Sequence, residues 1–124
     1  MAAPNIVGIS TLIGITSVFQ LTNTNQTNVL QNPPSSNKVF KINTIQVTNA
    51  NPSTDAYVSI GISAKAGAAT TTNYLIANAG IATGTSLVVV DKASSFYLEE
   101  DKTITAQTSI ANQTQIIVSY ESVE

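Results

Sequence analysis

Hydrophobic residues recur along this chain mainly at every second position, which is the period of a β-strand with one buried face. The segment 56–63 shows this pattern most clearly. Its expected inward-facing residues are Ala56, Val58, Ile60 and Ile62. The residues between them are small or polar, apart from Tyr57, so we expect Tyr57 to face outward.

The segment 38–49 predicts a strand that is interrupted by a β-bulge. Its hydrophobic residues change parity between Ile42 and Ile45. One extra residue near Asn43 and Thr44 would produce this shift and would bend the strand.

The remaining period-two segments are shorter, and loops rich in Thr, Ser, Asn, Gln and Pro separate them. Strands are expected at 13–21, 74–79, 87–90, 103–107 and 115–120. In the first of these, Ile13, Ile15, Phe19 and Leu21 share one face with Ser17 as a polar exception. Loops are expected at 22–28, 32–37, 49–55 and 64–73.

No segment has a helical period, and a turn follows every strand. About seven to nine short strands without a substantial helix predict an all-β fold, a single antiparallel β-sandwich of jelly-roll type. The predicted core residues are Val58, Ile60, Ile62, Ile104, Ile116 and Val118.

The domain organisation is simple, with residues 13–124 forming the sandwich. Residues 1–12 are either a plain first strand or an arm that pairs with the sheet edge of a neighbouring subunit. The run of four hydrophobic residues at 87–90 is typical of a strand covered on both faces, by the core or by a neighbouring subunit. The candidate contacts with a subunit or lattice are Asn5, Ile6, Val7, Ile9, Leu12, Ile13, Ile15, Leu87, Val88, Val89 and Val90.

Charged residues make up only 10% of the chain, whereas soluble proteins average about 25%. Hydroxyl and amide side chains must therefore supply most of the polar surface. The net charge of −2 has the wrong sign for binding a phosphate backbone, so no nucleic-acid partner is expected. The hydrophobic stretch at 6–21 is interrupted by polar residues, so no membrane partner is expected either.

The chain has no His, Cys, Trp or Arg. The missing His and Cys exclude a Ser-His-Asp triad, a Cys-His pair and the common zinc sites. Without Arg, no guanidinium can recognise phosphate or carboxylate. We therefore expect no cofactor and no enzymatic activity.

Three local features could indicate a binding or catalytic site, and each also has a purely structural interpretation. The acidic run Glu99, Glu100 and Asp101 is interpreted as a solvated turn, because a calcium site needs about six to eight oxygens. All seven carboxylates lie at predicted turns, strand edges or the terminus, which disfavours a paired-carboxylate glycosidase. Tyr57 could stack on a sugar, but so few exposed aromatic residues would make a poor carbohydrate site.

Three short strings carry a resemblance to a known class of proteins. They are Met1-Ala2-Ala3-Pro4-Asn5-Ile6-Val7, Phe96-Tyr97-Leu98-Glu99-Glu100-Asp101 and Ile117-Val118-Ser119-Tyr120-Glu121. The chain resembles, over most of its length, small virion structural proteins of tailed phages that infect marine cyanobacteria. The resemblance assigns no binding residue.

This resemblance implies a component of the virus particle. The expected function is that of a capsid decoration (cement) protein, which binds the outer surface of the shell as a homotrimer and has the major capsid protein as its partner. The alternative is a neck, tail or fibre component with a receptor- or sugar-binding role, which predicts exposed aromatic residues gathered on one loop face. A carboxylate hydrolase would instead need two acids within about 10 Å of each other in a cleft.

Overall fold

The computed structural model describes residues 11–63 and 72–124. Within these residues the chain forms nine β-strands and one three-residue 3₁₀ turn, η2, at Lys92–Ser94. The strands are β1 (Leu12–Leu21), β2 (Thr27–Asn32), β3 (Val39–Asn49), β4 (Ala56–Ser63), β5 (Thr72–Ile81), β6 (Ser86–Val90), β7 (Phe96–Leu98), β8 (Lys102–Thr108) and β9 (Thr114–Val123). The predicted all-β fold is confirmed.

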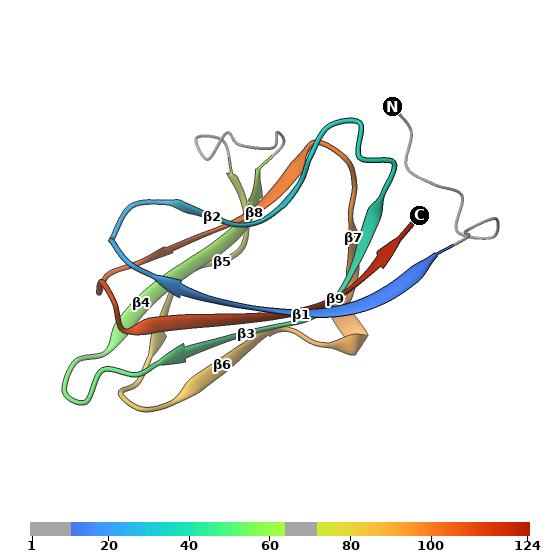
Figure 1. Ribbon diagram of the computed structural model, residues 1–124. Coiled ribbons are helices and arrows are strands. Elements are labelled where there is room, and N and C mark those ends of the chain that lie inside the picture. Colours follow the sequence, from blue (N-terminus) through green and yellow to red (C-terminus); the bar gives the residue numbers. More distant parts are fainter. Residues whose placement is uncertain (1–10, 64–71) are drawn as a thin grey trace.

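The strands form two antiparallel sheets that pack face to face as a sandwich (Figure 1). In the first sheet the order is β1-β9-β3-β6, and β7 also pairs with β3. In the second sheet the order is β2-β8-β4-β5. Strands that are neighbours in a sheet are thus often distant in sequence, as in a jelly roll.

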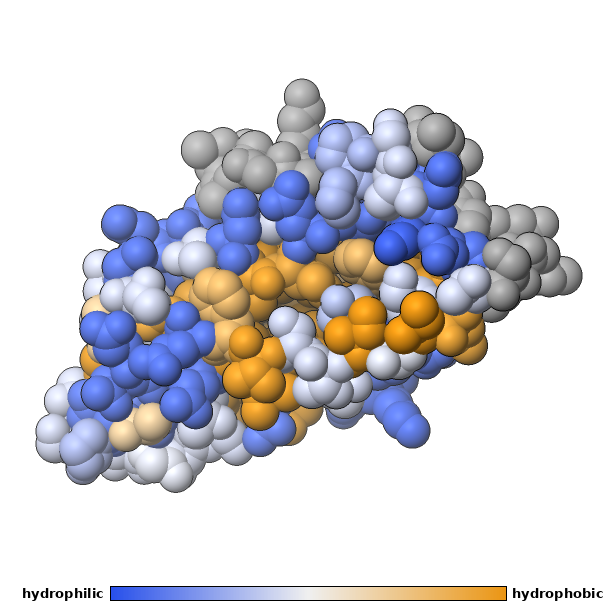
Figure 2. Space-filling model, in the orientation of Figure 1, coloured by the Kyte–Doolittle hydropathy of each residue, from blue (hydrophilic) through white to orange (hydrophobic). Residues whose placement is uncertain are grey.

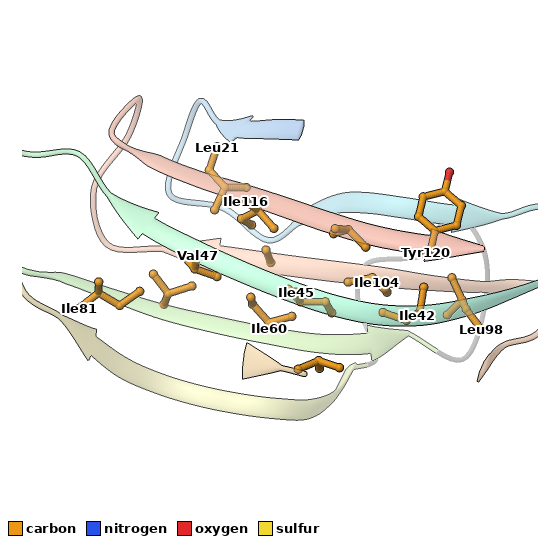
Figure 3. Packing of buried hydrophobic residues seen from close by; sticks show 14 of the residues in the cluster. Leu21, Ile42, Ile45, Val47, Ile60, Ile81, Leu98, Ile104, Ile116 and Tyr120 are labelled. Carbon is orange, nitrogen blue, oxygen red and sulfur yellow. The ribbon is translucent and has the colours of Figure 1, made fainter. Parts of the chain in front are cut away.

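The inner faces of the two sheets enclose one hydrophobic core (Figure 3). Five of the six predicted core residues are buried, namely Val58, Ile60, Ile104, Ile116 and Val118. The prediction was wrong for Ile62, which is only half-buried at the edge of the core. β4 keeps its parity, because it pairs with β8 without a shift and the register shifts around Ile60 come from extra residues in β5. Ile62 is therefore still directed inward, opposite Ile104, but it lies one residue before the end of β4.

The predicted bulge in β3 is confirmed. The register between β3 and β9 shifts between Ile42 and Thr44, which leaves Asn43 as the extra residue. Because of this shift, Ile42 and Ile45 both reach the core although three positions separate them.

The structure differs from the sequence prediction at several strands. β2 was not predicted, and its first two residues fall in the expected loop 22–28. In β1 the expected inward residues Ile13 and Ile15 are exposed, because β1 is an edge strand of its sheet. Most of the expected loop 64–73 lies outside the described residues, and β5 begins within its last two positions.

Two fully buried asparagines hold the loops that follow β2 and β3. The Asn32 Nδ2 donates to the carbonyl oxygens of Lys38 and Leu98, each at 3.0 Å. The Asn49 Nδ2 donates in the same way to Thr54 and Ile81, also at 3.0 Å. Each amide therefore joins a loop to a strand of the opposite sheet from inside the sandwich.

Tyr120 closes one end of the core. Its ring lies against Phe40, with the two ring centroids 5.0 Å apart. Burial raises the pKa of the Tyr120 phenol above its ordinary value, because the charged form would lose its hydration.

Candidate interaction surface

The outer face of the first sheet carries a row of three hydrophobic side chains and one glutamine that crosses all four main strands. Val18 on β1 is opposite Ile117 on β9, Ile117 is opposite Gln46 on β3, and Gln46 is opposite Val88 on β6. Residues directly opposite in a sheet share a face, so these four side chains form one line, called here the outer row. Val18 is 71% exposed, Val88 56% and Ile117 36%.

Uncharged polar residues flank the outer row on both sides. One flanking row consists of Thr16, Ser119 and Thr44, and the other of Gln20, Gln115, Thr48 and Ser86. Among the described strand residues, charge enters this face only toward one end, where Lys41 is opposite Glu121 and the Asn43 Nδ2 donates to Glu121 Oε1 at 3.1 Å. A hydrophobic centre with an uncharged polar surround is the composition of a protein–protein interface.

A second hydrophobic surface lies along the edge of the sandwich. Figure 2 shows hydrophobic residues gathered in a band along β1 and between β1 and β2. Ile13 and Ile15 contribute to this side of the molecule, because they point toward the core side of the first sheet yet remain exposed. The sandwich is therefore open along β1.

The predicted contact residues differ in how far they are exposed in the structure. Asn5, Ile6, Val7 and Ile9 lie outside the described residues. Leu12, Ile13, Ile15 and Val88 are exposed, whereas Leu87 and Val89 are half-buried against the core. Val90 is only 3% exposed and belongs to the core.

Within one chain the run at 87–90 is not covered on both faces, so cover by the core alone is excluded and cover by a neighbouring subunit stays a prediction. β6 is an edge strand, and Val88 projects from the outer face of the first sheet. The four residues are hydrophobic for different reasons, since Val90 completes the core and Val88 adds to the outer row.

The acidic run at 99–101 forms the turn between β7 and β8, as expected. Asp101 adopts a positive φ of 60°, and its backbone N–H donates to the carbonyl oxygen of Asn32 at 2.9 Å. Both carboxylate oxygens of Glu100 are buried without a hydrogen-bond partner. Across 11–63 and 72–124 there is no cluster of three metal-ligating side chains and no helix able to cross a membrane. The part of the chain that the structure describes contains no pocket either.

The exposed tyrosines do not gather on one surface. Tyr57 and Tyr74 lie on the outside of the second sheet, opposite Gly80 and Gly61 of neighbouring strands, whereas Tyr97 belongs to the first sheet. The ring of Tyr57 covers Gly80, where an added Cβ would be 3.4 Å from its Cε1. Among the described residues, the aromatic loop face that a receptor- or sugar-binding module would need is therefore not formed.

Sequence reasoning missed Val18 and Ile117, two of the three hydrophobic members of the outer row. Each is a hydrophobic residue at a position of its strand that is expected to face outward, and this was the only indication in the sequence. The signal was insufficient because the sequence does not show that β1 pairs with β9 in the register that makes the two residues neighbours.

No protein-family model matches this chain, and no curated protein matches it. Solved structures of capsids do match. A chain from the acidic stable capsid of Helicobacter pylori bacteriophage KHP30 is similar with a TM-score of 0.54 and 17% identity, over 94% of this chain and 90% of that chain. A chain from the T13 particle of the virus IBDV is similar with a TM-score of 0.51 and 12% identity.

The two matches differ in how much of the other chain they cover. The IBDV match covers 93% of this chain but 31% of that chain, so this sandwich spans less than a third of the IBDV chain. The KHP30 chain, in contrast, is matched almost from end to end. At these identities the likeness shows the fold, which is one that phage and viral capsid chains adopt.

Proposed function

We propose that this protein is a structural component of a phage virion, a decoration protein that binds the outer surface of the capsid. The observation that carries this proposal is the end-to-end match with a chain of the KHP30 capsid. That chain consists of little more than a sandwich of this kind. A chain of a phage capsid can therefore consist of such a sandwich without a large additional domain.

The surface of the protein supports the same function. The outer row and its flanking residues form a face that can bind a neighbour through shape, hydrophobic contact and hydrogen bonds. Threonine and serine lose less rotamer entropy in an interface than long charged side chains do. Low charge also makes the contact less dependent on ionic strength.

We further propose that the protein binds the major capsid protein as a cyclic homotrimer. A trimer at a threefold position of a shell contacts three capsid subunits at once, and linked contacts of this kind multiply affinity by about 100 to 10,000. The uncharged edge strand β6 supports this part of the surface as the contact between subunits. A species that is monomeric both on the particle and in solution at on the order of tens of micromolar would contradict the trimer.

The N-terminal segment gives the most direct test of shell binding. We propose that the arm at residues 5–9 contacts the shell, so deletion of residues 1–9 should leave a folded β protein that no longer binds. The measurement is co-sedimentation of the purified full chain and the shortened chain with capsids that lack the protein. Circular dichroism serves as the control for folding.

Two outcomes of this experiment would contradict the proposal. A shortened chain that binds capsids as well as the full chain does would exclude the arm as the contact. A full chain that binds purified tails and not capsids would contradict the decoration function and favour the neck, tail or fibre alternative.

A further inference from the structure

β1 has one free edge of hydrogen-bonding groups among the described residues. Thr11 and Glu124 exchange two backbone hydrogen bonds of 3.0 Å each. Hydrogen-bonded pairs alternate along an antiparallel ladder, so the odd residues of β1 bond to β9. The even residues therefore direct their N–H and C=O groups away from the sheet. These are Leu12, Gly14, Thr16, Val18 and Gln20.

This edge lacks the features that normally prevent strands from pairing between molecules. β1 contains no charged residue and no proline, and its ten-residue register with β9 has no shift. The edges of the second sheet differ, since pairings of both β2 and β5 contain register shifts. β6, at the other edge of the first sheet, has only five residues. A long, regular, uncharged edge is a template for a further strand.

We propose that the partner of this edge is β1 of a second copy of the chain, paired antiparallel about a twofold axis at Thr16. In this register Thr16 is opposite its own equivalent, Gly14 is opposite Val18, and Leu12 is opposite Gln20. Every outward N–H and C=O of β1 then has a partner. The two first sheets join into one continuous sheet across the dimer.

The side chains of β1 complement one another in this register. Thr16 beside Thr16 is a favourable cross-strand pair, and Val18 lies beside Gly14, whose Cβ position has no heavy atom within 4 Å. On the core side, Ile13 faces Phe19 of the second copy and Ile15 faces Ser17. The dimer therefore covers the two isoleucines that a single chain leaves exposed along its open side (Figure 2).

The pairing also has no electrostatic cost along the strand, because neither copy brings a charge to it. It is independent of the proposed function and of the trimer. The contact proposed for the trimer involves β6, on the opposite edge of the first sheet. In a decorated shell, pairing through β1 would link neighbouring trimers.

The register can be tested with single cysteines, because the natural chain has none. Thr16→Cys places two thiols opposite each other across the axis, about 5.5 Å apart at Cα. Gln20→Cys is the matched control on the same edge and the same face. In the proposed register, Gln20 of one copy is opposite Leu12 of the other copy. Eight residues at ~3.4 Å each separate positions 12 and 20 along the strand, so the two thiols at position 20 would be about 27 Å apart.

We expect a short thiol-to-thiol crosslinker to join Thr16→Cys into covalent dimers on a denaturing gel and to leave Gln20→Cys as single chains. The gel counts only covalently joined pairs, so the result does not depend on whether trimers also form. Equal crosslinking of both variants would contradict the twofold at Thr16. Absence of crosslinking in Thr16→Cys would contradict the β1 pairing itself.

A charge exchange provides a second test of the axis. Thr16→Lys and Thr16→Glu should each abolish the pairing of like copies, because the two charges would be directly opposite. An equal mixture should restore dimers in analytical ultracentrifugation. If each variant alone pairs as well as the unmodified chain, the proposed register is wrong.

Discussion

At the scale of single residues, buried amides organise the loops of this sandwich. Asn49 donates to two carbonyl oxygens and accepts a hydrogen bond from the backbone N–H of Asn51, at 3.0 Å. Asn32 repeats the arrangement with Ser36, whose hydroxyl donates to its Oδ1 at 2.6 Å. From the sequence, Asn32 and Asn49 could only be assigned to polar loops, because the strand that supplies the second carbonyl is distant in the chain.

Replacing Asn49 with alanine should strongly destabilise the fold. The change removes three hydrogen bonds, and the carbonyl groups of Ile81 and Thr54 lose their donor, the first from a buried hydrogen bond and the second from a partly buried one. We therefore expect a loss of about 2–4 kcal/mol in the free energy of unfolding. Urea unfolding followed by circular dichroism measures the effect. Asn23→Ala is the control, because Asn23 is exposed and its side chain accepts one local bond from Asn25. A loss at Asn49 no larger than at Asn23 would contradict the account.

In contrast to the replacement of Asn49, replacing Glu100 with glutamine is expected to stabilise the fold. Its two buried carboxylate oxygens lack partners, and an uncompensated buried charge is costly. Glu100→Gln should therefore raise the free energy of unfolding by about 1 kcal/mol at neutral pH. The exposed neighbour gives the control variant Glu99→Gln, which should change little. A clear destabilisation by Glu100→Gln would show that the carboxylate makes a favourable interaction after all.

At the scale of strands, period-two alternation predicted most of the elements, because each sheet has one face buried in the core. The parity change in β3 even predicted the bulge at Asn43. β2 was not predicted because its polar residues resemble those of the preceding loop. The partial exposure of Ile62 was not visible in the alternation of β4, because it depends on the position of Ile62 next to the end of that strand. The outer row as a whole could not be predicted, although Val88 was a predicted contact residue, because the row depends on the registers of three strand pairs.

The role of the outer face can be tested on its central strand. Ile117→Asp introduces a charge into the outer row, away from both edges of the sheet, and should weaken binding to capsids by at least about tenfold. Gln107→Asp is the matched control, because Gln107 is exposed on the central strand β8 of the second sheet. Co-sedimentation with capsids measures both variants. Equal binding by the two variants would exclude the outer row as a contact.

At the scale of the whole molecule, the chain combines one well-defined core with an unusually uncharged surface. The low charge was visible in the composition, whereas the two hydrophobic surfaces appeared only once the sheets were assembled. The outer row and the open edge at β1 face different directions, so one copy can contact two neighbours at once. A protein that covers a repeating lattice needs such a combination.

The most direct test of the proposed virion role is a cryo-electron microscopy reconstruction of the intact phage particle from the source of this chain. We predict density for the sandwich on the outside of the capsid, repeated at equivalent positions of the shell. The outer face of the first sheet should be directed toward the major capsid protein. Density for the sandwich found only in the neck, tail or fibres would contradict the account.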